Sequence, residues 1–429
     1  MQSQIIIDIL NREIKKSTGC TDPGAVALAV ARATRNLGSI PEAVEVQVSP
    51  NVFKNGVSVG IPGTDKKGLF QAAALGMFLS EWVEEDLGLL DHVDENIMQN
   101  SLDILDRNAV NVSYKQDVPD PLYVQADIFK GSEHAWTIIQ GDYTNVIQEG
   151  LNGKMLLETS LEQEQKSANN LLEFKLAELL EEIVSMDASQ LSFLLDAAWI
   201  NKEAANQGLK DSKTKMGPVY YELIGAQEFP FSAMAWGKFY TAAAAEARML
   251  GLNVPIMAIS GSGNHGVTNF LGILAAAETL KASREDTVKA LAISSVITIY
   301  IKGYIKRMTA FCGCSVAAAT GVTAGTVYLL GGVYQNMLQA MHSVLGALAG
   351  VVCDGAKVSC AYKLSTATAA AIEYAYLAKE KGVFIPQNEG IIAGNIEDTF
   401  KNLGKLNNPG MLETDKCLLE IIQSNQSGS

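Results

Sequence analysis

Five of the six cysteines lie in three short segments that also contain glycine. They are Cys20 in TGCTDP (18–23), Cys312 and Cys314 in FCGC (311–314), and Cys353 and Cys360 in VCDGAKVSC (352–360). The N-terminus lacks the basic region and long apolar stretch of an export signal, so we expect these thiols to act as metal ligands and not as disulfides. Three thiolates can hold an iron–sulfur cluster with one open iron, which would act as a Lewis acid. For Cys20 the alternative is a buried, unreactive thiol, and Cys417 is expected to pack in a helix.

A glycine-rich segment, ISGSGNHG (259–266), is the second chemical signal. It follows an apolar stretch and precedes a helix expected from about residue 267. Such turns present backbone N–H groups to anions. The segment is not a P-loop, because no Gly-Lys-Ser/Thr follows, and the dinucleotide spacing is shifted. We therefore expect Ser260, Ser262 and Asn264 to bind a small anion such as a substrate carboxylate, with a plain tight turn as the alternative.

A lysine and two amide side chains fall in a third segment, SPNVFKNG (49–56), between two expected strands. Lys54 and Asn51 could hold a carboxylate at this position. A solvated hairpin would carry the same residues, so the sequence leaves both interpretations open.

Composition restricts the class of protein. The chain has 429 residues, enough for two or three domains, and 48% are hydrophobic. Its formal charge of 33 − 47 = −14 argues against nucleic-acid binding and favours a cytoplasmic enzyme with a small-molecule partner. The most apolar stretch, residues 316–352, is interrupted by Asn336, Gln339 and His342, so we expect a buried core there and no membrane contact.

The periodicity of apolar residues predicts an α+β fold, in which a mostly helical Ala/Gly-rich domain carries a smaller inserted α+β subdomain. The helical domain would comprise residues 1–42 and 161–429, and the insertion residues 43–160. Helices are expected at 3–17, 23–36, 68–84, 170–186, 190–207 and 231–249, with more between 266 and 380. Strands are expected at 44–48, 57–61, 110–114, 122–128 and 134–139. Closely packed Ala/Gly-rich helices are compatible with a homodimer.

With these motifs in one order, nearly the whole chain resembles the L-cysteine desulfidase family, which is related to the alpha chain of bacterial iron–sulfur L-serine dehydratases. The resemblance rests on TGCTDP, the segments 49–56 and 261–266, the Cys312 segment and CDGAK (353–357). It implies an oxygen-sensitive [4Fe-4S] cluster held by three cysteines, with substrate on the fourth iron. The implied ligands are Cys20, Cys353 and one of Cys312 and Cys314, with Cys312 favoured and Cys360 a lesser candidate. In the family, glutamine is more common where this chain has His265.

The implied reaction is α,β-elimination of L-cysteine to hydrogen sulfide, ammonia and pyruvate. The candidate bases for the α-proton are Lys54, His265 and Lys357; a lysine needs burial or a nearby cation for this role. One alternative is dehydration of L-serine, or elimination from another β-substituted amino acid. A pyridoxal-phosphate lyase would need a Schiff-base lysine and a phosphate cup, neither of which is identifiable. A non-enzymatic thiol or metal-binding protein is the alternative of another class.

Overall fold

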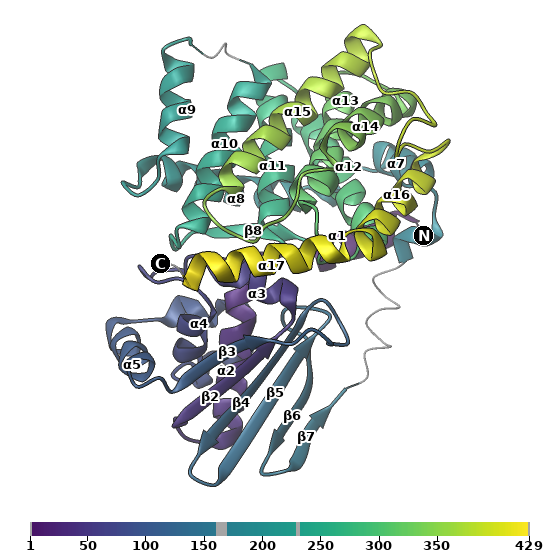
Figure 1. Ribbon diagram of the computed structural model, residues 1–429. Helices are drawn as coiled ribbons and strands as arrows, with labels where there is room; N and C mark the ends of the chain where they lie inside the picture. Colours follow the sequence, from purple (N-terminus) through teal and green to yellow (C-terminus); the bar gives the residue numbers. More distant parts are fainter. Residues whose placement is uncertain (1, 160–169, 229–231, 428–429) are drawn as a thin grey trace.

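The computed structural model describes residues 2–159, 170–228 and 232–427. In Figure 1 a layer of helices lies above a twisted sheet that is backed by helices, and the C-terminal helix α17 (Leu412–Ser427) runs between the two. The fold is mostly helical α+β, which confirms the fold class predicted from sequence.

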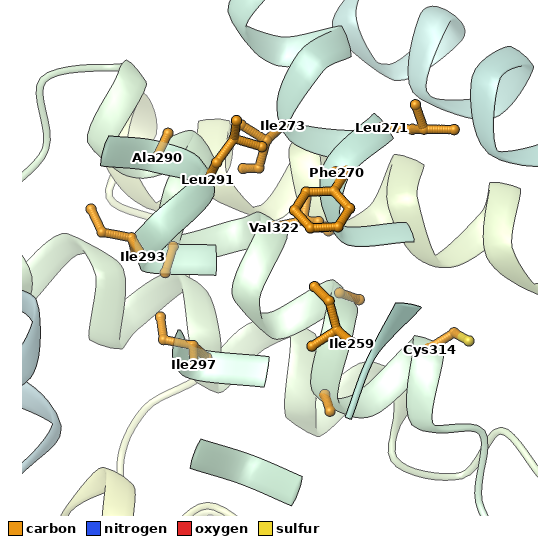
Figure 2. Packing of buried hydrophobic residues seen from close by; sticks show 14 of the residues in the cluster. Ile259, Phe270, Leu271, Ile273, Ala290, Leu291, Ile293, Ile297, Cys314 and Val322 are labelled. Atoms are coloured by element: carbon orange, nitrogen blue, oxygen red, sulfur yellow. The ribbon is translucent and has the colours of Figure 1, made fainter. Parts of the chain in front are cut away.

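The upper layer is built from helices rich in alanine and glycine, which lets their backbones approach closely. A Cβ atom on Gly321, for example, would lie 2.3 Å from the carbonyl oxygen of Ser294. Figure 2 shows part of this core, to which Phe270, Leu291, Val322 and also Cys314 belong. The helices are α1 (Gln2–Glu13), α7 (Leu176–Ser185), α8 (Phe193–Lys210), α9 (Met216–Gly225), α10 (Ala233–Met249), α11 (Gly263–Leu280), α12 (Arg284–Ile305), α13 (Ala319–Leu329), α14 (Tyr334–Leu348), α15 (Cys360–Lys381) and α16 (Ile396–Lys405).

The lower layer holds a six-stranded sheet in the order β3-β2-β4-β5-β6-β7. Its strands are β2 (Ala43–Val48), β3 (Val110–Tyr114), β4 (Tyr123–Lys130), β5 (Glu133–Gln140), β6 (Val146–Leu151) and β7 (Lys154–Glu158). The sequence predicts an antiparallel sheet, whereas β2 and β3 pair in parallel, because α4 (Leu69–Gly76) and α5 (Glu95–Asp106) lie between them in the chain. Alternate residues of β2 are buried, as its period-2 pattern predicts.

One face of the sheet is covered by α2 (Thr21–Leu37), whose alanines and valines share a core with β4 and β5. The sequence predicts this helix at residues 23–36. The larger cluster of buried residues fills the helical layer. The proposed division into residues 1–42 with 161–429, and an insertion at 43–160, stays a prediction.

Two elements expected around residues 49–61 are wrong. Residues 49–56 do not form a hairpin loop but the short helix α3 (Pro50–Gly56), with the side chain of Ser49 accepting a hydrogen bond from the N–H of Val52 at 3.2 Å. Serine before proline is a strong helix start. The strand expected at 57–61 is absent there, and only Gly60 makes a single bridge, to Lys67.

The first expected helix is also too long. The helix α1 ends at Glu13, and β1 (Ile14–Thr18) pairs antiparallel with β8 (Pro255–Ile259). A partner 240 residues away decides this conformation, which local periodicity cannot reveal. The helix expected at 68–84 likewise stops at Gly76, and a 3₁₀ segment (Ser80–His92) follows.

In the part of the chain that the structure describes, one helix, α12, is long and apolar enough to cross a membrane by length and composition. However, 89% of its most apolar window is buried inside the protein, and core helices pass the same test. The stretch 316–352, which the sequence predicts as core, forms α13, α14 and a π-helical turn (Cys314–Ala318).

Candidate functional site

Two motifs that are 240 residues apart meet where α2 and α11 begin. The hydroxyl of Thr21 donates to the carbonyl of Gly261 at 3.3 Å. Arg248, on α10, donates to the carbonyl of Gly19 at 2.6 Å and to the side-chain oxygen of Asn264. The Cys20 segment is therefore fixed against the glycine-rich turn.

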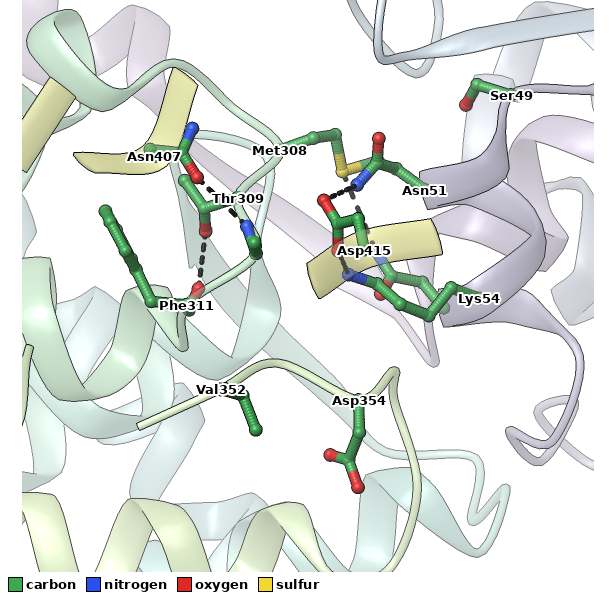
Figure 3. Close-up of polar contacts among 12 residues, drawn as sticks. Ser49, Asn51, Lys54, Met308, Thr309, Phe311, Val352, Asp354, Asn407 and Asp415 are labelled. Atoms are coloured by element: carbon green, nitrogen blue, oxygen red, sulfur yellow. Dashed lines mark hydrogen bonds and ion pairs between the residues drawn. The ribbon is translucent and has the colours of Figure 1, made fainter. Parts of the chain in front are cut away.

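The other two cysteine segments run side by side. The backbone N–H of Cys312 donates to the carbonyl of Val351 at 2.6 Å, and that of Cys353 donates to the carbonyl of Ala310 at 2.7 Å. Phe311 and Val352 are bridged as in a sheet, and Figure 3 labels both of them. The π-helical turn that begins at Cys314 follows directly, and such turns are frequent at functional sites.

The Cys353 segment also contacts α3. Gly355 has a φ of +95°, and a Cβ atom there would lie 2.1 Å from the carbonyl oxygen of Lys54. Only glycine fits this turn. Burial raises the pKa of the Cys353 thiol, while the nearby Lys54 ammonium works against that rise.

Cys20 packs with Val59 and Met249 against Cys360 and its neighbours. The five cysteines of the three segments therefore converge, and none of them forms a disulfide. Cys417 is exposed on α17, so the expectation that it packs is wrong. Leu419, two residues further along that helix, is the buried residue.

Cys312 and Cys314 behave as an interacting pair. The Cys314 thiol donates a hydrogen bond to Cys312, which lowers the pKa of Cys312 to about 6 and raises that of Cys314. This favours a thiolate at Cys312. The preference for Cys312 as the ligand remains a prediction.

His265 is buried beside this pair. A Cβ atom on Gly313 would lie 2.3 Å from His265 Nε2, so glycine is needed between the two cysteines. The other ring nitrogen, Nδ1, lies 3.3 Å from the carbonyl oxygen of Ile259, which makes it the protonated nitrogen of a neutral ring. Burial, and then the charge of Lys302, lowers the pKa of His265 to about 3.

The three polar residues expected in the glycine-rich turn have different environments. Ser262 caps α11 by accepting a hydrogen bond from the N–H of His265 at 3.4 Å, so this helix starts four residues earlier than predicted. The side-chain oxygen of Asn264 accepts a hydrogen bond from Arg248. Ser260 is buried with a φ of +49°, and its hydroxyl has no hydrogen-bond partner among the described residues. A strained residue with a free buried hydroxyl is available for a ligand.

Asn51 and Lys54 already hold a carboxylate. Lys54 Nζ lies 2.5 Å from one oxygen of Asp415, and Asn51 Nδ2 lies 3.3 Å from the other. Figure 3 shows both side chains pointing from α3 toward Asp415 on α17. Lys357, by contrast, is half-buried and pairs with Asp354 at 2.6 Å.

Several charged residues of the site were missed from the sequence. Asp22 is buried, and Cys20 Sγ donates to it at 3.5 Å; burial raises its pKa to about 7. Arg248 and Lys302 are buried within the apolar helices α10 and α12. A charge after a long uncharged run (residues 290–301 before Lys302), or in an alanine-rich helix (Arg248), is the signal that could have identified these two.

The donor set agrees with a cluster better than with a single ion. Among the residues that the structure describes, no three histidine, cysteine or acidic side chains are grouped closely enough for one metal ion. A cluster binds each cysteine to a different iron, so its ligands stand further apart. The buried Arg248 interacts electrostatically with the thiols of Cys20, Cys360 and Cys314. Buried thiols beside a buried cation fit a thiolate-bound anionic group.

Known proteins resemble this chain over most or nearly all of its length. A family model described as serine dehydratase alpha chain matches residues 150–420. A UPF0597 protein of Methanocella arvoryzae is 45% identical over 422 residues, covering 98% of this chain and 99% of that protein. UPF0597 proteins of Alkaliphilus oremlandii and Clostridium tetani are 37% and 34% identical, each over at least 97% of both chains.

Proposed function

Because the chain belongs to the serine dehydratase alpha-chain family, we propose that it is an iron–sulfur lyase that breaks L-cysteine down to hydrogen sulfide, ammonia and pyruvate. The observation that carries the proposal is the convergence of five free cysteines from three distant segments, together with the carboxylate-holding pair Asn51 and Lys54 and the free hydroxyl of Ser260. A non-enzymatic thiol protein would need neither of those two groups.

The residues that would hold a [4Fe-4S] cluster are Cys20, Cys312 and Cys353, with Cys314 and Cys360 as lesser candidates. The cluster would supply a Lewis acid for the leaving sulfur of the substrate. The thiol of Cys312 is the one whose pKa is lowered, which favours it over Cys314.

Two positions are candidates for binding the substrate carboxylate. The free hydroxyl of Ser260 and the first turn of α11 form one of them. Asn51 and Lys54 form the other, and in this arrangement they bind the carboxylate of Asp415. Either position would hold the amino acid by its carboxylate and turn its α-proton toward the protein.

The candidate bases differ in what they contact. Lys54 and Lys357 each pair with a carboxylate, and that pair must separate before either lysine accepts a proton. His265 is neutral and has an unprotonated Nε2 facing the Cys312 segment, although its low pKa makes it a weak base. His265 is the base that this arrangement favours.

The test is anaerobic purification with iron and sulfide counted, followed by a sulfide-release assay on L-cysteine. We expect about four irons per chain and activity that oxygen destroys. A colourless protein that stays iron-free and inert after cluster reconstitution would contradict the proposal and favour a non-enzymatic thiol or metal-binding role.

The family name favours a second candidate, dehydration of L-serine, which the same site would perform by expelling hydroxide. A higher catalytic efficiency on L-serine than on L-cysteine would select it. The cytoplasmic location, the homodimer and the absence of nucleic-acid and membrane partners stay predictions.

A further inference from the structure

Arg248 is a buried cation without a carboxylate partner. Its side chain extends from α10, and the residue is 2% exposed. Two of its nitrogens donate to Gly19 and Asn264, and its Nε has no hydrogen-bond partner. Among the described residues no carboxylate forms an ion pair with it, although the carboxyl of Asp22 interacts with it electrostatically. It also interacts electrostatically with the thiols of Cys20, Cys360 and Cys314.

An arginine keeps its proton in proteins, so this charge cannot be removed by titration. A buried charge that lacks a counter-charge is strongly unfavourable. Besides Asp22, whose pKa burial raises to about 7, the groups that could supply negative charge to the guanidinium are the thiols of the cysteine segments.

The surrounding backbone makes room for the guanidinium. A Cβ atom on Gly263 would lie 2.4 Å from Arg248 Nη2, so only glycine fits at that position. The other partner, Gly19, has a φ of +71°, a conformation that favours glycine. Glycines on both sides of Arg248 thus allow one side chain to join the Cys20 segment to the glycine-rich turn.

We propose that Arg248 is the positioning residue of the cluster, which fixes the Cys20 loop and supplies the buried counter-charge for the thiolate-bound cluster. The inference rests on the iron–sulfur part of the proposed function and is independent of which amino acid is the substrate. The guanidinium fork is needed because its two donors reach two different loops, which a lysine cannot do with the same geometry.

A second buried basic side chain also interacts with the thiols. Lys302, on α12, donates to the carbonyl of Arg307 at 2.8 Å and forms no ion pair with a described carboxylate. It interacts electrostatically with Cys314, Cys353 and Cys312. Arg248 is the better one to test, because its charge does not depend on pH.

The experiment compares two variants with a matched control. Arg248→Met removes the charge at similar length, and Arg248→Lys keeps the charge without the fork. Arg35→Met removes an arginine of α2 that pairs with Glu84 at the surface. Each protein is reconstituted anaerobically, and we measure bound iron, its rate of loss to a chelator, the midpoint potential, and Tm with and without iron.

We expect Arg248→Met to lose iron about tenfold faster than the wild type. Its midpoint potential should fall, because a nearby positive charge favours the reduced cluster. Without iron the Tm of this variant should not fall, because an uncompensated buried charge has been removed. With iron bound, the variant lacks the stabilising charge pair, so the rise in Tm on loading iron should be smaller than in the wild type. Arg248→Lys should hold its potential near that of the wild type and still lose iron faster. Arg35→Met should match the wild type in every measurement.

The inference would be overturned if Arg248→Met matched the wild type in iron retention, midpoint potential and the iron-dependent rise in Tm. If that variant does not fold, unchanged iron retention in Arg248→Lys overturns it instead. A wild-type protein that loads iron but releases no sulfide from any amino acid would contradict the proposed function and leave the inference standing. A wild-type protein that binds no iron overturns both.

Discussion

Lys54 and Asp415 form an ion pair, 2.5 Å from Nζ to Oδ1, although 361 residues separate them in the chain. The Lys54 side chain is 1% exposed and that of Asp415 is 19% exposed, so solvent screens the pair only in part. The pair joins α3 to α17, the helix that lies between the two layers in Figure 1. The carboxylate of Asp415 is therefore bound by Lys54 and Asn51, the side chains that the sequence predicts to bind a carboxylate.

Replacing Lys54 with methionine should both destabilise the protein and weaken substrate binding. Asp415 would keep a partly buried charge without its partner, which we expect to lower the free energy of unfolding by about 1–3 kcal/mol. The comparison is Lys416→Met, which breaks an exposed pair with Glu413 on the same helix and should change stability by less than about 0.5 kcal/mol. Urea denaturation measures the free energy of unfolding of both variants. Equal losses of stability in the two would contradict a special role for the Lys54 pair.

The cysteines differ sharply in expected importance. Cys353→Ala should remove most of the bound iron and abolish lyase activity, because a cluster held by three thiolates would lose one of them. Cys417→Ala should retain both, since that thiol is exposed on α17 and belongs to none of the three cysteine segments. Iron analysis and a sulfide-release assay on the two proteins decide the matter, and full turnover by Cys353→Ala would remove it from the ligand set.

Acid should destabilise the iron-free protein partly through His265. Its folded pKa of about 3 lies below the ordinary value of 6.5, so below pH 6.5 the unfolded chain takes up a proton that the folded one refuses. Stability from this group is thus complete above pH 6.5 and falls by up to about 1.4 kcal/mol per pH unit as the pH drops toward 3.

His265→Gln removes the titrating group and keeps a side chain that can hydrogen-bond. The loss of stability between pH 7 and pH 5, measured by urea denaturation, should be smaller in this variant than in the wild type. Parallel curves for the two proteins would show that the imidazole is free to protonate in the folded state.

A methyl group at Gly313 should disturb the contact between the cysteine pair and His265. The new Cβ atom would lie 2.3 Å from Nε2, and relieving that clash should cost about 1–3 kcal/mol of unfolding free energy. Gly225→Ala, at the end of α9, meets no atom within 4 Å and should be neutral or slightly stabilising. The double variant Gly313→Ala with His265→Ala should recover part of the loss; no recovery would place the strain elsewhere.

Local signals in the sequence carried much of the fold and part of the site. Apolar alternation identified β2, β4 and β5, and proline in the first turn identified α2. The glycines beside the cysteines identified three segments that do meet. Such signals depend on neighbours within a few residues, which sequence shows directly.

What could not be predicted depends on distant partners. The strand β1 exists because β8 pairs with it. Asp415 belongs to the site because it pairs with Lys54, which joins α17 to α3. Arg248 could be recognised as an unusual charge in an alanine-rich helix, but its two partners lie in segments that no local pattern connects to it. The helix α3 is different, because its Ser-Pro start was visible and was outweighed by an expected hairpin.

The pairing of β1 with β8 also sets an order of events during synthesis of the chain. Cys20 leaves the ribosome long before Pro255–Ile259 exists, and the remaining four thiols of the site follow only at residues 312–360. A nascent chain thus carries one isolated thiol and an unpaired strand for most of its translation. On the proposed iron–sulfur assignment, metal delivery to this site would be a late event, and truncated N-terminal fragments would have no place to receive it.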